Sequence, residues 1–409
     1  MKDFRALIIG TDINAYYMSR CYHELTGKKA DLIGKAPMAF TSVSDITNVQ
    51  IEDNLWDSKV FVQTLINYAK KQNSEEKILL IGTNDNYVKL IIENRSLLEK
   101  YYVFNYPDIN IVNNLLIKEK FYDTYKNMGL DMPKTYIYKC NQNDDINKIK
   151  ENFKEYPIII KPSDGVEYHH LEETLDKVYK AKSEEELEKI ILKIEKAGYK
   201  NNLIIQEFIP GDDSALFDSI FYVSKNKKAQ IATFAQIGLQ EHAPRMIGNA
   251  AALINGYSEF PGVTEQIGKI KEFMESIGYQ GFAEFDMKYD ERDGKYKVME
   301  INARQGRCSY YITPCGYNLV EILAKDLIFN EQLEYEVIEK QQLLCFVPKS
   351  VVKKYITNER FKEKVLSMWD DRVHPLRYKK DNGFLRKLLL VKIAWNYIKE
   401  YKENNWDWN

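Results

Sequence analysis

Three polar side chains alternate in the segment KVMEINARQG, residues 297–306, namely Glu300, Asn302 and Arg304. Successive side chains of a β-strand point to opposite faces, so these three groups would share one face. Met299, Ile301 and Ala303 would occupy the other face. The segment therefore predicts a strand with one buried face and one face that carries an acid, an amide and a guanidinium.

A hairpin is expected to bring further acids to this strand. Upstream lies GFAEFDMKYDERDGKYKVMEIN, two alternating runs separated by DERDG, a turn signal with Gly294. With Tyr289 paired to Lys295, Asp286 would lie diagonal to Glu300 on the same face. A bulge near the turn would exchange the faces of one strand, so this prediction depends on register.

Asp286, Glu300 and Asn302 would then present oxygen ligands from neighbouring strands. Such a set suits a hard cation such as Mg²⁺, which shares its remaining positions with water and phosphate. Acids placed so closely repel each other unless a cation lies between them. The alternative is an ordinary hairpin with a solvated polar face.

Two lysines are candidates for phosphate binding. Lys161 ends an apolar strand in YPIIIKPSDGVEY and is followed by a Ser-Asp-Gly loop whose backbone N–H groups would surround phosphates. Lys118 lies in LLIKEKF, within the helix predicted for NNLLIKEKFYDTYKNMGL. Neither matches a Walker loop, and the alternative for both is a solvated lysine.

The segment LIIQEFIPGDDS is a candidate for binding a nucleoside. An apolar strand here runs into an extended segment, whose backbone at Gln206, Glu207, Phe208 and Ile209 would face a purine edge. Asp213 would accept hydrogen bonds from ribose hydroxyls. The alternative is a strand that ends in a Pro-Gly turn.

The elements that must position these groups fall into three blocks. About 115 N-terminal residues alternate apolar runs, RALIIG and KILLIG, with helical segments, which predicts an α/β domain with a parallel sheet. Both runs end in glycine-led polar loops, GTDIN and GTNDN, at the strand ends where ligands bind in such sheets. Further strands and helices follow, and a tail of about 80 residues rich in Lys, Tyr and Trp ends the chain.

Composition excludes several classes of protein. The 409 residues include 58 basic and 60 acidic ones, which argues against a nucleic-acid surface. Five scattered cysteines, with no CxxC pair, indicate reduced thiols. The N-terminal apolar run is too short for a signal peptide, and no stretch approaches the roughly 18 apolar residues of a membrane span. We therefore expect a cytoplasmic protein.

The order of these motifs resembles that of the ATP-grasp ligases, over residues 113–330. A helix with a lysine, a strand with Lys161, the linker QEFIPGDD and a hairpin with Asp and Glu-x-Asn follow one another as in that family. The resemblance implies a pre-ATP-grasp α/β domain at 1–115, an α+β ATP-grasp domain at 116–330 with subdomains 116–205 and 206–330, and a C-terminal extension at 331–409. It also implies ATP and Mg²⁺, with two ions, as cofactors.

Carried over by position, the resemblance assigns a role to each motif. Lys118 and Lys161 would contact the phosphates, covered by the loop of Ser163, Asp164, Gly165 and Val166. Residues 206–209 would line the adenine pocket, Asp213 the ribose site, and Asp286, Glu300 and Asn302 the metal site. Arg304 would meet the transferred phosphate or the acyl phosphate, with Lys161 and Arg245 as further catalytic groups.

One position departs from the family pattern. Glu284 stands where some relatives carry an arginine, so another cation must neutralise the intermediate. Arg245 in HAPRMIG and Arg307 in RQGRCSY are candidates, and the alternative for both is a surface arginine.

Within this group the chain looks most like carboxylate–amine ligases of the D-aspartate ligase type. That type attaches D-aspartate to the lysine side chain of a peptidoglycan precursor such as UDP-muramoyl-pentapeptide. The carboxylate attacks the γ-phosphate and an amine then displaces phosphate from the acyl phosphate. Thr11, Asp12, Asn14 and Arg307 would help to hold the substrates. The alternatives are a ligase with another amino acid and a peptide, glycan or natural-product acceptor, or a nucleotide-binding regulatory protein without turnover.

The segment of residues 377–402 carries eight Lys or Arg and two acids, a net charge of +6. Phe384, Leu388, Val391, Trp395 and Ile398 recur at helical spacing and form an apolar stripe with basic flanks. We expect this terminal helix to pack on the body of the protein. The alternative is peripheral contact with an anionic membrane surface.

Overall fold

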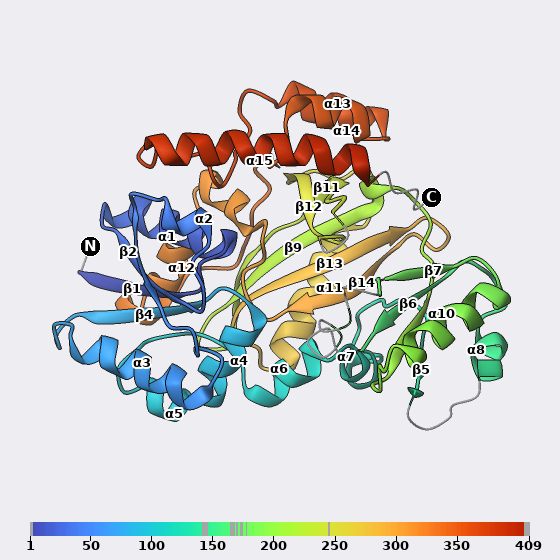
Figure 1. Ribbon diagram of the computed structural model, residues 1–409, viewed down its shortest axis with the longest axis horizontal. Coiled ribbons are helices and arrows are strands. Elements are labelled where there is room, and N and C mark those ends of the chain that lie inside the picture. The colour runs from blue at the N-terminus through green and yellow to red at the C-terminus, as the bar shows by residue number, and fades with distance from the viewer. Residues whose placement is uncertain are drawn as a thin grey trace.

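The computed structural model describes residues 3–140, 146–163, 168, 171, 175–176, 178–243 and 246–404. Within them the chain forms three β-sheets with helices around them, and a layer of C-terminal helices along one edge (Figure 1). This mixture of a parallel sheet and antiparallel sheets confirms the predicted fold class.

The N-terminal sheet is parallel, with its strands in the order β3-β2-β1-β4. The strands β1, β2 and β4 are largely apolar and buried, as expected where helices cover both faces, whereas the edge strand β3 is polar and partly exposed. Ile9 of β1 pairs with Gly82 of β4, so the loops that follow these strands lie beside each other. The elements are β1 (Phe4–Ile9), α1 (Ile13–Thr26), β2 (Ala30–Gly34), α2 (Ala39–Ser42), β3 (Thr47–Ile51), α3 (Ser58–Lys70), β4 (Lys77–Gly82), α4 (Asp85–Glu93) and α5 (Arg95–Leu98).

Two short helices replace the single helix expected for residues 113–130. α6 (Ile109–Leu116) ends where Ile117 takes an extended conformation, and α7 (Lys118–Tyr125) begins at the next residue. The Lys118 N–H donates to the Ser163 carbonyl, 3.2 Å away, instead of continuing the first helix. The break places Lys118 at a helix start, directly against the strand that carries Lys161.

The small sheet is antiparallel, in the order β5-β8-β6-β7. Its core joins alternate strand residues, such as Ile158 and Ile160, to Leu187 and Ile191 of a covering helix. β8 runs through Glu207, so the expected boundary between residues 205 and 206 falls inside a strand. The elements are β5 (Thr135–Tyr138), α8 (Ile146–Asn152), β6 (Ile158–Pro162), β7 (Tyr179–Ala181), α10 (Glu184–Lys196) and β8 (Leu203–Glu207).

The large sheet follows the path β14-β13-β9-β11-β12-β16, with β10 and β15 beside it. β16, from the expected C-terminal extension, pairs with β12, so the extension contributes an edge strand to this sheet. The strands are β9 (Leu216–Val223), β10 (Ala229–Ala232), β11 (Ala235–Gln240), β12 (Ala250–Asn255), β13 (Gly281–Asp290), β14 (Lys295–Asn302), β15 (Glu336–Val337) and β16 (Gln342–Cys345). The helices that accompany it are α11 (Val263–Ser276) and α12 (Leu319–Ala324), with short 3₁₀-helices at Asp213–Ala215 and Ser309–Cys315 and a π-helix at Lys325–Phe329.

The β13–β14 hairpin has a different register from the expected one. Tyr289 pairs with Tyr296 rather than Lys295, a shift of one residue that by itself would turn Glu300 towards the core. A β-bulge at Met299 adds a second shift, so Asp286 lies directly opposite Glu300. Met299 therefore lines the cleft instead of joining Ile301 in the core, and Val298 is buried in its place.

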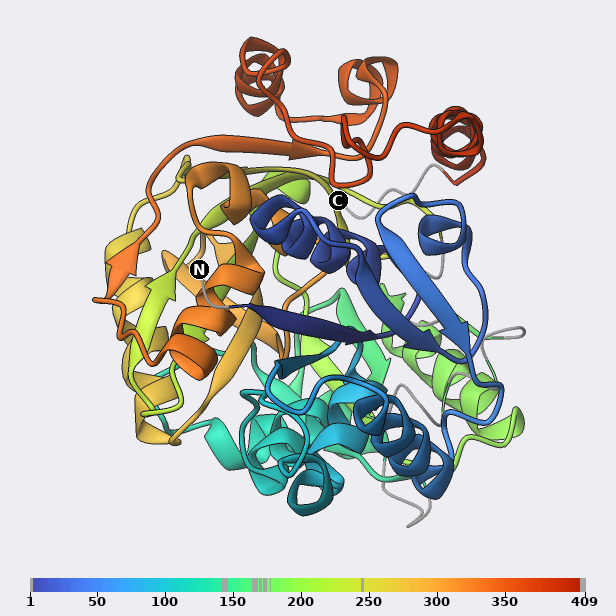
Figure 2. The ribbon, with the colours of Figure 1, turned by 90° about the vertical axis from the view of Figure 1, so that its left-hand side faces the viewer.

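The C-terminal layer comprises α13 (Lys349–Tyr355), α14 (Glu359–Ser367) and α15 (Phe384–Glu403) (Figure 2). α15 packs on the body, as expected, but through a different face. Tyr397 and Tyr401 are buried, whereas the predicted apolar stripe faces solvent, with Val391 68% exposed and Trp395 63% exposed. Within the described residues, no helix has the length and apolar character needed to cross a membrane.

A buried ion pair within the C-terminal extension contacts the N-terminal domain and fixes α15 to it. The Arg386 guanidinium lies 3.6 Å from the Asp381 carboxylate, and both side chains are fully buried. Arg386 also donates to the carbonyls of Phe40 and Leu376 and stacks over the ring of Tyr16. The C-terminal extension is thus held by contacts that span the whole chain.

Candidate active site

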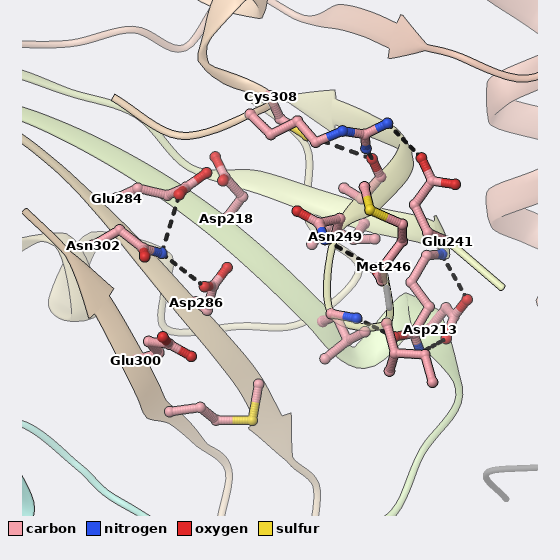
Figure 3. A pocket seen from close by; sticks show the side chains of 18 of the residues that line it. Asp213, Asp218, Glu241, Met246, Asn249, Glu284, Asp286, Glu300, Asn302 and Cys308 are labelled. Atoms are coloured by element: carbon pink, nitrogen blue, oxygen red, sulfur yellow. Dashed lines mark hydrogen bonds and ion pairs between the residues drawn. The ribbon is translucent and has the colours of Figure 1, made fainter. Parts of the chain in front are cut away.

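A cleft with a volume of about 950 Å³ lies where the three sheets meet. The N-terminal domain contributes Asp12 and Asp85, the small sheet contributes Lys161, and the large sheet contributes the acids of β13 and β14. Figure 3 shows these acids on one side of the cleft, facing Asp213, Glu241 and Asn249. The sequence-predicted groups from separate motifs therefore lie around one cavity.

The predicted metal ligands come together on the hairpin (Figure 3). The Asn302 amide donates to Asp286 at 3.3 Å and to Glu284 at 3.2 Å. Glu300 lies across from Asp286 in the paired strands. Glu284, whose role was open, is the deepest acid of this group.

Asp218 of β9 adds an acid that the sequence did not single out. It lies opposite Asp286 in the β9–β13 pairing and accepts a hydrogen bond from the Tyr311 hydroxyl, 2.7 Å away. Burial, and to a lesser extent the nearby Asp286 carboxylate, together raise the pKa of Asp218 to about 7. Burial and the Asp218 charge likewise raise the pKa of Glu284. Burial is the largest cause of both shifts, and the neighbouring carboxylates add to it.

The ligand set fits Mg²⁺ bound together with phosphates. Among the described residues, no three His, Cys, Asp or Glu side chains form a complete metal cage. Asp286, Glu300 and Asn302 offer two carboxylates and one amide oxygen, which is the partial set that Mg²⁺ uses when substrate phosphates and water complete its shell. A cation at this point would also relieve the repulsion that the pKa shifts record.

Lys118 and Lys161, the two candidates for phosphate binding, both line the cleft. The Lys118 ammonium lies 3.1 Å from the Glu300 carboxylate, so it stands beside the candidate metal site. Ser163 is buried next to the start of α7 and is joined to Lys118 through the backbone. Asp164, Gly165 and Val166, and also Arg245, lie outside the described residues.

The nucleoside segment follows the end of β8. Because Gln206 and Glu207 are paired within the sheet, the stretch that leaves the strand is Phe208 and Ile209, and all four residues line the cleft. The Glu207 side chain forms an ion pair with Arg292 at 2.8 Å. The Gln206 amide donates to the Thr135 hydroxyl at 2.9 Å.

Two cations and one acid flank this segment. Lys180 and Lys288 lie over the Phe208 ring, 4.1 and 5.3 Å from its centroid. Burial lowers the pKa of the Lys288 ammonium to about 8. Asp213 accepts hydrogen bonds from the Gln240 backbone N–H and side-chain amide, at 2.8 and 2.6 Å.

Arg304 connects the hairpin to the N-terminal domain. Its guanidinium lies 3.0 Å from Asp85 and 3.7 Å from Glu284. Burial alone would lower the pKa of Arg304, but these two carboxylates raise it, so the group stays charged. Asp85 was missed as a site residue, although the loop GTNDN that contains it was marked by its position after a parallel strand.

Comparison with known proteins decides the family. No family model matches the sequence. A D-aspartate ligase from Enterococcus faecium (strain Aus0004) is 32% identical, over 98% of this chain and 97% of its own length. The chain belongs to the ATP-grasp carboxylate–amine ligases of the D-aspartate ligase type. The predicted resemblance and enzyme class are thereby confirmed.

Solved structures show the same fold as this ligase. N5-carboxyaminoimidazole synthetase from Staphylococcus aureus, complexed with ADP, has a TM-score of 0.63 at 15% identity, over 88% of this chain and 87% of that one. The biotin carboxylase domain of 2-oxoglutarate carboxylase from Hydrogenobacter thermophilus, in complex with MgADP, ADP and bicarbonate, has a TM-score of 0.61 at 15% identity, over 84% of this chain and 74% of that one. These structures support the ATP-grasp fold of the ligase independently of the sequence match.

Arg307 of the ligase is not a surface arginine. Its guanidinium lies 2.6 Å from the buried Glu241 carboxylate, 3.0 Å from the Tyr397 hydroxyl, and over the Phe346 ring. It lines the end of the cleft that α15 helps to form. Local sequence patterns did not identify Glu241 as its partner, because 66 residues separate them.

The N-terminal substrate candidates divide into two groups. Asp12 and Asn14 line the cleft, with Asp12 also capping α1 through the Ala15 N–H. The Asn14 amide donates to the Thr83 carbonyl at 3.0 Å, which ties the two loops together. The Thr11 hydroxyl donates to the Ala36 carbonyl at 2.7 Å, and Thr11 is not part of the cleft lining.

A substitution at Gly306 tests whether the position of the Glu284 carboxylate matters for turnover. A methyl group at this position would overlap the Glu284 carboxylate. Gly306→Ala is therefore expected to displace Glu284 and lower the rate of ATP turnover by about tenfold or more, at a cost of roughly 1–3 kcal/mol in the free energy of unfolding. Steady-state kinetics and urea denaturation measure both effects.

The matched control is Gly268→Ala, in the interior of α11, where an added methyl group meets nothing within 4 Å. This change should leave turnover unaltered and raise stability by about 0.5–1 kcal/mol. Equal turnover in the two variants would contradict the assigned position of Glu284.

Proposed function

We propose that this ligase uses ATP and Mg²⁺ to join D-aspartate to the lysine side-chain amine of a peptidoglycan precursor. The observation that carries the proposal is the convergence of Asp286, Glu300 and Asn302 with Lys118 in a cleft built by all three sheets. The relative named D-aspartate ligase, which matches almost the whole chain, supports the choice of amino acid. The ADP and MgADP of the two solved structures support the cofactors.

The chemistry follows from the two sides of the cleft. A substrate carboxylate oxygen attacks the γ-phosphorus of ATP, the bond to the bridging oxygen breaks, and ADP leaves. Lys118 and Lys161 stabilise the charge on the phosphate oxygens. Mg²⁺ held by Asp286, Glu300 and Asn302 would neutralise the charge that the phosphates bring to this acidic face.

The second half-reaction forms the amide. The acceptor amine attacks the carbonyl carbon of the acyl phosphate, phosphate leaves, and the amine loses a proton. Arg304 lies at the edge of the acidic face, where it would hold the transferred phosphoryl group. Because Asp85 already pairs with Arg304, the guanidinium is fixed in direction before any substrate binds.

The far end of the cleft is the proposed substrate end. Asp12 and Asn14 approach from the N-terminal domain, and Arg307 approaches from the loop that follows β14. Arg307 is held by Glu241 and Tyr397, so it is a rigid donor for a substrate carboxylate. We place the reaction in the cytoplasm, in keeping with the free cysteines at positions 21, 140, 308, 315 and 345.

The test is phosphate release from Mg-ATP with each substrate omitted in turn. Release that requires both D-aspartate and UDP-muramoyl-pentapeptide would support the full proposal. Release with another amino acid or another amine would keep the carboxylate–amine ligation and overturn the substrate assignment. No release with any pair, despite nucleotide binding, would favour a nucleotide-binding regulatory protein.

A further inference from the structure

Helix α15 has two different faces, and only one of them is used by the protein. Its inner face carries Arg386, Tyr397 and Tyr401, which are buried against the body. The Tyr401 hydroxyl donates to the Gln240 carbonyl at 2.6 Å, and the Tyr397 hydroxyl donates to Glu241 at 2.9 Å. The helix is therefore held in place independently of what its other face contacts.

The outer face of α15 is a row of large apolar side chains in solvent. The row runs the length of the helix, with Phe384 75% exposed at its start and Ile398 46% exposed near its end. Its members, the outer face hereafter, are Phe384, Leu385, Leu388, Val391, Trp395 and Ile398. Figure 2 views the helix along its axis, at the periphery of the molecule. Contiguous exposed apolar rows of this kind indicate an interaction surface.

Positive charge accompanies the outer face. Lys387, Lys392, Lys399 and Lys402 are exposed on the same helix. The helix contains two acids, Glu400 and Glu403, and Glu403 pairs with Lys399 at 3.8 Å. The exposed part of the helix is thus apolar along one line and cationic beside it.

We infer that the outer face of α15 docks on an anionic lipid bilayer. A helix with an apolar row and flanking lysines lies in the membrane interface, with the apolar side chains below the headgroups and the ammonium groups among them. None of the described helices could span a bilayer, so α15 would lie on the surface of the membrane. A second copy of the chain is a poorer occupant, because two such faces would bring like charges together.

The position of the helix gives this docking a consequence for the cleft. Ile393 and Tyr397, on the inner side of α15, line the substrate end of the cleft. One helix therefore forms part of the cleft wall on one side and the proposed membrane-binding surface on the other. Docking would hold the substrate end of the cleft close to the bilayer.

The experiment measures binding of the full chain to vesicles of phosphatidylcholine alone and of equal parts phosphatidylcholine and phosphatidylglycerol. We expect sedimentation with the anionic vesicles and weak binding to the neutral ones. Trp395 should enter the interface, so the fluorescence of the protein should shift to shorter wavelength. The Trp395→Phe variant should lose that shift while still binding.

Two variants separate the apolar and the charged contributions. The triple variant Leu388→Ser, Val391→Ser, Trp395→Ser should lose vesicle binding by about a hundredfold or more. Lys387→Gln with Lys392→Gln should lose roughly fivefold for each lysine, and the remaining binding should depend less on added salt. The matched control, Leu192→Ser, removes an exposed leucine from α10 and should bind as the unaltered chain does.

The outcomes distinguish this inference from the proposed function. Unaltered binding in the triple variant, or no binding to anionic vesicles, would overturn it. Concentration-dependent dimers in light scattering that the triple variant abolishes would overturn it in favour of a second copy. Ligase activity with soluble substrates should persist in the triple variant, so loss of vesicle binding is independent of whether the substrates are correctly assigned.

Discussion

Replacing Glu300 with glutamine is expected to lower ATP turnover by about 10²–10³-fold while the chain remains folded. Glutamine keeps the shape of the side chain but removes one of the two carboxylates of the proposed metal site. It also leaves Lys118, 3.1 Å away, without its ionic partner. Phosphate release measured over a range of Mg²⁺ concentrations should show a higher Mg²⁺ requirement as well as the lower rate.

The control for this variant is Glu291→Gln, in the exposed turn of the same hairpin. It removes the same charge from the same hairpin, outside the cleft, and should leave turnover unchanged. If both variants turned over ATP at the original rate, the acidic face of the hairpin would not be the metal site. An unchanged Mg²⁺ requirement with a lower rate would instead assign Glu300 to positioning Lys118.

Replacing Arg386 with methionine is expected to lower the free energy of unfolding by about 3–5 kcal/mol. The change leaves the Asp381 carboxylate buried without its cation, and it removes the donors to the Phe40 and Leu376 carbonyls. Urea denaturation, followed by circular dichroism, measures the loss. Detachment of α15 at lower urea than the main transition would be a second sign.

Lys387→Met is the matched control, because Lys387 is the exposed neighbour of Arg386 on the same helix. It should change stability by less than about 0.5 kcal/mol. A similarly small effect of Arg386→Met would show that the hydrogen bonds from Tyr16, Ser44 and Asp45 are sufficient to hold the Asp381 charge.

Local patterns predicted the fold well, because they depend on neighbouring residues. Alternation and turn residues identified the β13–β14 hairpin, and apolar runs with glycine identified β1 and β4. The register failed by one residue at the turn and by one more at Met299, and the two errors compensated at Glu300. A bulge leaves little trace in a sequence, since both of its residues are compatible with a strand.

The partners of the site residues could not be predicted from the sequence, for a different reason. Arg304 pairs with Asp85 and Arg307 with Glu241, across 219 and 66 residues, and such pairs are set by how the sheets pack. Asp218 shares the acidic face only because β9 lies next to β13. Periodicity likewise identified the apolar row on α15, but not that another face of the helix would be the buried one.

The bulge at Met299 also divides the hairpin into two halves that evolve under different constraints. Towards the turn, Tyr296 and Val298 fill the core, whereas beyond the bulge Glu300 and Asn302 face the cleft. The extra residue of the bulge sets the register of the acidic half apart from that of the turn half. The turn half can therefore vary in sequence without changing the direction in which the acids point. Among homologues we expect divergence to concentrate in the exposed turn at residues 291–295, with the acidic half changing slowly.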